Sequence, residues 1–151
     1  MKVIFLDIDG VLNSDVYDKE RDAKDGNIDV SRLPLLKRLI DETGAKTVLS
    51  SSWREHWEKD ESILSDTGKD LINTFRQAGI EIFDKTPVMS SRSEEISHWL
   101  SLHPETEGFV IFDDNIFGWG ELSERLIRTN KKVGRGLEEE HIKEALRLLN
   151  G

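Results

Sequence analysis

The sequence predicts an α/β protein with a doubly wound, mostly parallel, five-stranded Rossmann-like sheet and helices on both faces. Three observations lead to this prediction. Strand and helix patterns alternate along the chain, the strand segments are apolar throughout, and acidic or hydroxyl residues follow several of them. Uniformly apolar strands are typical of a parallel sheet whose two faces are both covered by helices. In such folds the functional site lies outside the carboxyl ends of the strands.

Five strands are expected, because five short segments are rich in β-branched and other apolar residues and are bounded by polar or turn-forming residues. The first has the sequence KVIFL and ends just before Asp7. In chain order the expected strands are 2–6, 46–50, 80–83, 108–114 and 125–129. Their lengths suit strands, which in globular proteins usually have about 3–10 residues.

Helices are expected between the strands, where apolar residues recur at helical spacing. Ser31 is expected to cap a helix that ends near Gly44, and Ser91 forms a capping-box pattern with Glu94 ahead of another. Further helical segments are expected at 53–58, from Leu71 to Gly79 and from Ile142 to Leu149. The segment 13–30 is polar and charged, so it is expected to form a loop or short irregular structure.

Composition limits the class of protein. The length of 151 residues suits one domain, and we expect a single domain spanning 1–151. No apolar run approaches the ~20 residues of a membrane span and no signal peptide is expected, so we predict a cytoplasmic protein with no membrane contact and no obligate protein partner. The absence of cysteine excludes disulfides, a thiolate nucleophile and cysteine-ligated zinc. The net charge of −9 disfavours broad binding to nucleic acid but permits recognition of one phosphorylated end.

Acidic and hydroxyl side chains follow three of the expected strands. Asp7 and Asp9 come after the first strand, Ser50 ends the second, and Asp113 and Asp114 end the fourth. If these strands are neighbours, four carboxylates and a hydroxyl converge at one edge of the sheet. Such a cluster repels itself unless a cation is bound, and a ligand set made only of oxygen suits Mg²⁺. A magnesium site is therefore expected.

The residue types in this cluster suit phosphoryl transfer. A carboxylate can attack phosphorus and form an aspartyl-phosphate, and Asp7, at the strand end, is the better placed nucleophile. Asp9 lies two residues further on, where it could protonate the leaving oxygen and then activate water. The Ser50 hydroxyl could donate to a phosphoryl oxygen, and a cation such as Arg92 or Lys85 could offset the charge of that group.

Three motifs resemble those of the haloacid dehalogenase (HAD) superfamily of phosphohydrolases. They are DIDGV at 7–11, VLSSS at 48–52 and VIFDD at 110–114, and they match the first, second and fourth motifs of the family in order and spacing. The resemblance covers nearly the whole chain. It implies that Asp7 is the nucleophile and Asp9 the general acid/base.

The same resemblance implies which atoms would hold Mg²⁺. These are the carboxylate of Asp7, the backbone carbonyl of Asp9 and the later acidic pair. Within that pair, the family pattern implies that Asp114 is the direct ligand and that Asp113 supports it.

The second and third motifs leave alternatives. Ser50 matches the second-motif hydroxyl, although Ser51 and Ser52 leave its position open by one or two residues, and Ser51 is expected to contact substrate. The third motif usually places a lysine at the start of the helix before the fourth strand, and here the sequence departs from the family. Arg92 occupies that helix start, and Lys85 lies seven residues earlier. Because arginine can make a forked contact with phosphate and carboxylate, Arg92 is expected to be catalytic and Lys85 to bind substrate.

A narrower resemblance concerns a small branch of the superfamily. The sequence SSSWR, followed by R-x-x-E-I-x-x-W-L and DD, is similar to a capless HAD branch associated with RNA-repair domain architectures. Most HAD enzymes that act on small metabolites carry a cap domain, but 13–31 has room only for a flap and 52–91 is filled by helix and strand signals. We therefore expect an open site for a phosphate ester, with a nucleic-acid terminal phosphate as the leading substrate.

Several residues outside the motifs are candidates for contacting such a substrate. Arg54, just after the second motif, is expected to bind it. Trp119 could stack on a base, although packing within its loop is the more ordinary interpretation. The basic run 128–135 could contact a phosphate backbone, although a solvated turn is again the more ordinary interpretation.

Two other functions fit parts of the pattern. A receiver-like signalling domain also gathers acids at strand ends and accepts a phosphoryl group on aspartate, but it gains little from an acid/base at Asp9. A HAD phosphatase acting on small-molecule phosphate esters would use the same residues. Dehalogenation requires neither the second aspartate of DID nor the metal acids of FDD, so the sequence disfavours it.

Overall fold

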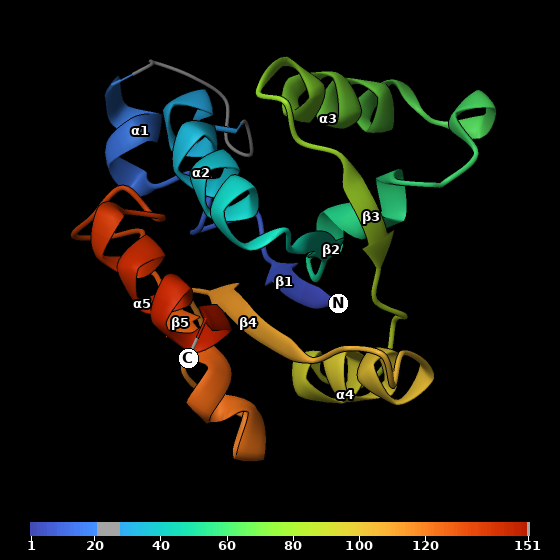
Figure 1. The fold of residues 1–151 in the computed structure, drawn as a ribbon. Coiled ribbons are helices and arrows are strands. Elements are labelled where there is room, and N and C mark those ends of the chain that lie inside the picture. The colour runs from blue at the N-terminus through green and yellow to red at the C-terminus, as the bar shows by residue number, and fades with distance from the viewer. Residues whose placement is uncertain (21–27, 151) are drawn as a thin grey trace.

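The computed structural model describes residues 1–20 and 28–150 and has an α/β architecture (Figure 1). Its five-stranded sheet has the order β3-β2-β1-β4-β5, and every pair of neighbouring strands is parallel. The strands are β1 (Lys2–Leu6), β2 (Lys46–Leu49), β3 (Ile82–Lys85), β4 (Gly108–Asp113) and β5 (Leu126–Arg128). The helices are α1 (Asp15–Glu20), α2 (Leu33–Thr43), α3 (Asp66–Gln77), α4 (Arg92–Leu102) and α5 (Glu139–Asn150). The predicted fold class is confirmed.

Helices cover both faces of the sheet, so that side chains of the central strand alternate between two cores. Ile4 and Leu6 of β1 point into the larger core, which contains the buried faces of α2, α3 and α5. Val3 and Phe5 point into the smaller core, which contains the buried face of α4. In Figure 1, α4 accordingly lies on the opposite side of the sheet from α2 and α5. Burial on both faces explains why the strands are apolar throughout.

The strand order places a topological switch point beside β1. The chain adds β2 and β3 on one side of β1, and then crosses over to add β4 and β5 on the other. The connections on the two sides of a switch point diverge, which leaves a crevice at the carboxyl ends of the two central strands. In this protein the crevice falls at the ends of β1 and β4.

Several element boundaries differ from those expected. The segment 13–30 contains the short helix α1 in its described part, while residues 21–27 lie outside the described residues. Ser31 does not cap α2, because it lies inside a 3₁₀ turn (Val30–Arg32) whose N-cap is Asp29. The helical segment predicted at 53–58 is a 3₁₀ helix, Ser52–His56.

The third strand starts two residues later than predicted. Ile80 is buried, and its N–H donates to the carbonyl of Phe75 at 2.9 Å, so Ile80 closes the end of α3 instead of entering the sheet. Pairing with β2 begins at Ile82. The strand therefore includes Asp84 and Lys85, polar residues that an edge strand tolerates.

No cap domain covers the carboxyl edge of the sheet in the described residues. The described part of 13–31 holds only α1 and a 3₁₀ turn, and 52–91 holds short 3₁₀ segments, α3 and β3. Within the described ranges, no helix is both long and apolar enough to cross a membrane.

Gly10 lets the loop after β1 pass close to the end of β4. Its φ angle is +83°, a conformation that L side chains rarely adopt. A Cβ atom at this position would lie 2.4 Å from Oδ2 and 2.9 Å from Cβ of Asp114. Because the contact reaches the Cβ atom of Asp114, rotating the carboxylate alone would not relieve it.

We predict that Gly10→Ala destabilises the protein more than Gly44→Ala does. Gly44 also has a positive φ, at the C-cap of α2, but no atom lies within 4 Å of its would-be Cβ. Both substitutions incur the conformational cost of about 1–2 kcal/mol, and only Gly10→Ala adds the steric cost of about 1–3 kcal/mol. Chemical denaturation of the two variants measures the difference. Equal losses would show that the loop moves away from Asp114 freely.

Candidate active site

The strand register brings three of the predicted site residues to the same level. The last residue of β1, Leu6, pairs with Leu49 of β2 and Phe112 of β4. The next residue of each strand is Asp7, Ser50 or Asp113, and the hydrogen-bond ladder continues through them. Asp7 N–H donates to the carbonyl of Phe112 at 3.0 Å, and Ser50 N–H donates to that of Leu6 at 2.9 Å. The expected convergence is therefore present for Asp7, Ser50, Asp113 and Asp114, but it does not include the side chain of Asp9.

Three carboxylates form a compact acidic cluster at this edge. One carboxylate oxygen from each of Asp7, Asp113 and Asp114 lies within 4.8 Å of the others. Asp7 and Asp113 are only 7% and 3% exposed. Backbone N–H groups support both, since that of Ile8 donates to Asp7 Oδ1 and that of Asn115 to Asp113 Oδ1, each at 2.9 Å.

Burial and mutual repulsion make these acids hard to ionise. The pKa of Asp7 is raised from 3.8 to about 7, first by burial and then by the charge of Asp113, while Arg92 acts in the opposite direction. The pKa of Asp113 is raised to about 6, mainly by burial, with a further contribution from Asp114. A bound cation would offset both effects.

The acidic cluster fits a metal ion of the hard, oxygen-binding kind. All of its ligand atoms are oxygens, they converge within one ion's reach, and they carry more negative charge than the surrounding groups offset. Oxygen ligands of this type suit Mg²⁺ better than the softer transition metals. Asp7, Asp113 and Asp114 are the residues that could hold it.

The side chain of Asp9 lies apart from the cluster. Its Oδ1 accepts a hydrogen bond from Asn13 Nδ2 at 2.9 Å, and its Oδ2 accepts one from the indole Nε1 of Trp53 at 3.3 Å. Asp9 is exposed and borders a depression of about 490 Å³, which is also lined by Gly10, Asn13, Ser14, Asp15, Asp18 and Lys131. This carboxylate is thus held at the solvent side of the acidic cluster.

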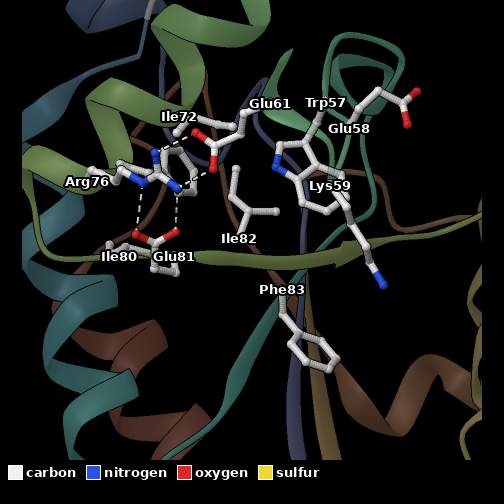
Figure 2. Close-up of a pocket in the computed structure, with 11 residues that line it drawn as sticks. Trp57, Glu58, Lys59, Glu61, Ile72, Arg76, Ile80, Glu81, Ile82 and Phe83 are labelled. Atoms are coloured by element: carbon white, nitrogen blue, oxygen red, sulfur yellow. Dashed lines mark hydrogen bonds and ion pairs between the residues drawn. The ribbon is translucent and has the colours of Figure 1, made fainter. Parts of the chain in front are cut away.

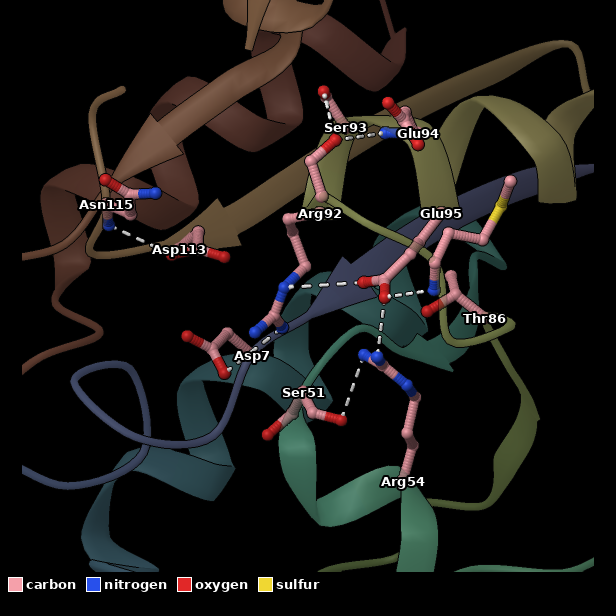
Figure 3. A network of polar contacts seen from close by, with 12 residues as sticks. Asp7, Ser51, Arg54, Thr86, Arg92, Ser93, Glu94, Glu95, Asp113 and Asn115 are labelled. Atoms are coloured by element: carbon pink, nitrogen blue, oxygen red, sulfur yellow. Dashed lines mark hydrogen bonds and ion pairs between the residues drawn. The ribbon is translucent and has the colours of Figure 1, made fainter. Parts of the chain in front are cut away.

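The cations predicted near the site lie in different environments (Figure 3). Arg92 is the first residue of α4, and its Nη1 lies 3.7 Å from Asp7 Oδ1. Arg54 is buried, and its Nη2 donates to Glu95 Oε2 at 2.7 Å, so its charge is balanced inside the protein. Arg92 is therefore the cation that faces the acidic cluster.

Lys85 is occupied elsewhere. Its Nζ donates to the backbone carbonyls of Arg54 and Trp57, at 3.2 and 2.8 Å, and to Glu58 Oε1 at 3.1 Å. Those contacts use all three ammonium protons. In this arrangement Lys85 fastens the segment 54–58 to the edge strand β3.

The two predicted serines also differ. The Ser50 hydroxyl is 1% exposed and has no hydrogen-bond partner among the described residues. A buried hydroxyl without a partner is costly and usually marks a ligand or water site. Ser51, by contrast, uses its hydroxyl to accept from Trp53 N–H, which caps the 3₁₀ helix that follows.

The other candidates for contacting substrate lie in different environments, and one exposed residue near them, Phe117, was not singled out from the sequence. Trp119 is 3% exposed, packs in the smaller core and donates its indole N–H to Asn115 O at 2.7 Å, so the packing interpretation holds. The exposed aromatic ring of the same loop is Phe117, which is 77% exposed. Within the basic run, Arg135 pairs with Glu20, while Lys131 and Lys132 are exposed.

Sequence reasoning also missed groups that brace the site from behind. Thr129 is fully buried, and its hydroxyl donates to the carbonyl of Gly10 at 2.7 Å, which ties the loop after β1 to the end of β5. Glu95 is 4% exposed and contacts both Arg54 and Arg92. In the sequence Glu95 is the glutamate of the R-x-x-E-I-x-x-W-L pattern, but a glutamate in the first turn of a helix is an ordinary dipole partner, so its contacts with two arginines were not predicted.

A separate cavity of about 130 Å³ lies at the free edge of the sheet, beside β3 (Figure 2). Arg76 spans its side by donating to the carboxylates of Glu61 and Glu81. None of its lining residues belongs to the acidic cluster. Its ion pairs are internally satisfied, so we assign it a structural part only.

The raised pKa values predict how the stability of the metal-free protein depends on pH. A carboxyl whose pKa is higher in the folded than in the unfolded state takes up a proton on folding, so its stabilising contribution is complete at low pH and is lost as pH rises through the folded pKa. For Asp7 and Asp113 that window runs from about 4 to about 7.

In chelator, lowering the pH from about 8 to about 5.5 should therefore raise the melting temperature of the wild type relative to that of Asp7→Asn. The amide cannot titrate, so groups that do not interact with Asp7 cancel in the comparison, and the difference reports on Asp7 and its coupling to Asp113. Adding Mg²⁺ should make the difference in melting temperature between the two proteins depend less on pH, because a bound cation favours the ionised carboxylates. Parallel melting curves across this range would contradict the raised pKa of Asp7.

Comparison with known protein families identifies the family of this chain. A family model described as the HAD domain in Swiss Army Knife RNA repair proteins matches residues 3–142. Searches of the curated proteins and of the solved structures returned no match. The matched range includes the strands β1 to β5, apart from Lys2 at the start of β1, and all of the residues of the acidic cluster. The chain therefore belongs to the HAD domains of Swiss Army Knife RNA repair proteins, a membership that implies a hydrolase of the phosphohydrolase type.

Proposed function

We propose that the protein is a Mg²⁺-dependent phosphomonoesterase that works through an aspartyl-phosphate intermediate. One observation carries the proposal. At the carboxyl edge of the sheet, the Asp7 carboxylate lies 3.7 Å from the Arg92 guanidinium and within 4.8 Å of the other acids of the cluster, level with the Ser50 hydroxyl, which has no partner among the described residues. A phosphoryl group bound there would meet a nucleophile, a cation and a hydrogen-bond donor together.

The proposed reaction divides into two displacements at phosphorus. In the first, an oxygen of Asp7 forms a bond to phosphorus while the bond to the leaving oxygen breaks, and Asp9 donates a proton to that oxygen. In the second, Asp9 accepts a proton from water, whose oxygen bonds to phosphorus as the bond to Asp7 breaks. The products are the alcohol and inorganic phosphate, and both aspartates return to their starting state.

The remaining residues orient and balance charge. Arg92 would pair with a phosphoryl oxygen and the Ser50 hydroxyl would donate to another, which offsets the negative charge that the transition state spreads over those oxygens. Asn13 and Trp53 hold the Asp9 carboxylate by its two oxygens. When bound by Asp7, Asp113 and Asp114, with the Asp9 carbonyl as a further ligand, Mg²⁺ would neutralise the cluster and polarise the phosphoryl group.

For the substrate we favour a phosphorylated nucleic-acid end. The site has no cap in the described residues, so a small metabolite would remain open to water, whereas a polymer end would cover the site itself. Phe117 and Trp53 offer aromatic surface at the rim, and Lys131 and Lys132 offer positive charge. The family description, which refers to RNA repair proteins, supports the same choice. A receiver-like role is not favoured, since Asp9 and its two supporting donors would serve no purpose there.

Substitution of the two aspartates tests the chemistry. Asp7→Asn should abolish turnover without unfolding the protein, because an amide cannot form the acyl-phosphate. Asp9→Asn should slow both displacements, but an activated aryl phosphate needs little protonation of its leaving group, so phosphoenzyme should accumulate with that substrate. Quenched-flow trapping and intact-protein mass spectrometry measure the amount of phosphoenzyme. Near wild-type turnover by Asp7→Asn would show that Asp7 is not the nucleophile.

A substrate panel tests the reaction class and the metal together. We expect 3′- or 5′-phosphorylated oligonucleotides to give the highest kcat/KM among oligonucleotides, mononucleotides, sugar phosphates and phosphopeptides. Activity should disappear in chelator, return with Mg²⁺ and weaken as salt rises. Sugar phosphates or mononucleotides leading by a wide margin would overturn the polymer-end substrate and leave the phosphatase intact. Full activity in excess chelator would overturn the metal-dependent mechanism.

A further inference from the structure

Glu95 is a buried carboxylate that lies between two arginines. It is 4% exposed and belongs to the first turn of α4, three residues after Arg92 (Figure 3). A buried carboxylate is costly unless its charge and its lone pairs are satisfied. Its contacts therefore indicate what the protein gains by keeping it.

The two oxygens of Glu95 have different partners. Oε2 accepts from Arg54 Nη2 at 2.7 Å and from the backbone N–H of Met89 at 2.9 Å. Oε1 lies 3.8 Å from Arg92 Nε. Because two short hydrogen bonds hold Oε2, the rotation of the carboxylate is fixed, and Oε1 is directed to Arg92.

Arg92 in turn contacts two acids through different nitrogens. Its Nε faces Glu95, and its Nη1 faces Asp7 at 3.7 Å. These contacts form a series of side chains with alternating charge, from Arg54 to Glu95, Arg92 and Asp7 (Figure 3). Only a guanidinium can do this, since a lysine has one nitrogen at its tip and could not face Asp7 and Glu95 at the same time through separate atoms.

We propose that Glu95 is a positioning residue that holds the Arg92 guanidinium against Asp7, and that Arg54 and the Met89 N–H hold Glu95 in the orientation this requires. The inference rests on the proposed function for its kinetic consequence but not for its geometry. It also assigns Arg54 a supporting role through its contact with Glu95, in place of the substrate contact expected from the sequence. The arginine at the start of α4, where the family usually has lysine, is then a matched partner of Glu95.

Kinetics on alternative backgrounds separate positioning from a general structural role. In the wild type, Glu95→Gln should lower kcat by about 10- to 100-fold with little change in KM, because a misplaced guanidinium fails mainly in the transition state. In an Arg92→Ala background the same change should alter kcat less than about twofold, since no guanidinium remains to be positioned. In an Arg92→Lys background, Glu95→Gln should raise kcat, because the ammonium is released to Asp7.

Glu94→Gln is the matched control. It removes the same charge from the same helical turn, but Glu94 is exposed and contacts Ser90 instead of an arginine. Its kcat should stay close to that of the wild type. If Glu95→Gln fails to fold, the pair Arg54→Gln with Glu95→Gln takes its place, because that pair leaves no uncompensated buried charge.

A spectroscopic readout tests the geometry without any catalysis. The arginine Nε–H signal of Arg92 can be identified in a ¹H–¹⁵N spectrum by its absence from Arg92→Lys. It should shift and exchange faster with water in Glu95→Gln, and stay unchanged in Glu94→Gln. If the wild type hydrolyses no phosphate ester but the signal responds, the proposed function fails and the positioning stands. An unchanged signal in folded Glu95→Gln, or an equal kinetic penalty on all three backgrounds, would overturn the proposal.

Discussion

The parallel pairing of β1 with both β2 and β4 is the constraint on which the site depends. This pairing aligns Leu6 with Leu49 and Phe112, so the next residue of each strand reaches the same level at the carboxyl edge. A shift of one residue in either pairing would turn a site side chain toward one of the two cores. Since both faces of β1 are buried, its alternation between the cores fixes the register firmly. The strand register that packs the two cores is therefore also the register that brings the site residues together.

That arrangement places several carboxylates close together in a buried part of the protein, where water screens their charges poorly. Asp7 and Asp113 are buried at the crevice, and Arg92 is held in place beside them by contacts that begin at Arg54, on the far side of Glu95. The arginine lowers the cost of ionising the acids but does not cancel it, because the pKa of Asp7 remains raised. The acidic cluster therefore remains electrostatically unfavourable in the folded protein, as expected where a protein gives up stability for a function.

Local patterns were enough to predict the sheet and the acidic cluster. The strand segments are short and apolar, and Asp7, Ser50 and Asp113 follow them directly, so the rule for parallel sheets sufficed. Contacts between distant residues were beyond reach. The Arg54–Glu95 pair and the Trp53–Asp9 hydrogen bond join residues about forty positions apart, and the motifs that contain these residues do not indicate which side chains meet. The N-cap of the turn before α2 and the start of β3 were misplaced by two residues each, because the Asp29 N–H bonds to the distant Leu12 carbonyl and the Ile80 N–H bonds back to the end of α3.

The indole of Trp53 has a consequence for how the protein can be observed. Trp57, Trp99 and Trp119 are all less than 5% exposed, whereas Trp53 is partly exposed and donates its N–H to Asp9. Indole emission responds to the charge and polarity of its immediate neighbours. The emission of this ring therefore depends on the carboxylate that it contacts, and subtracting the spectrum of Trp53→Phe separates that signal from the emission of the three buried indoles, without a label or a chromogenic substrate.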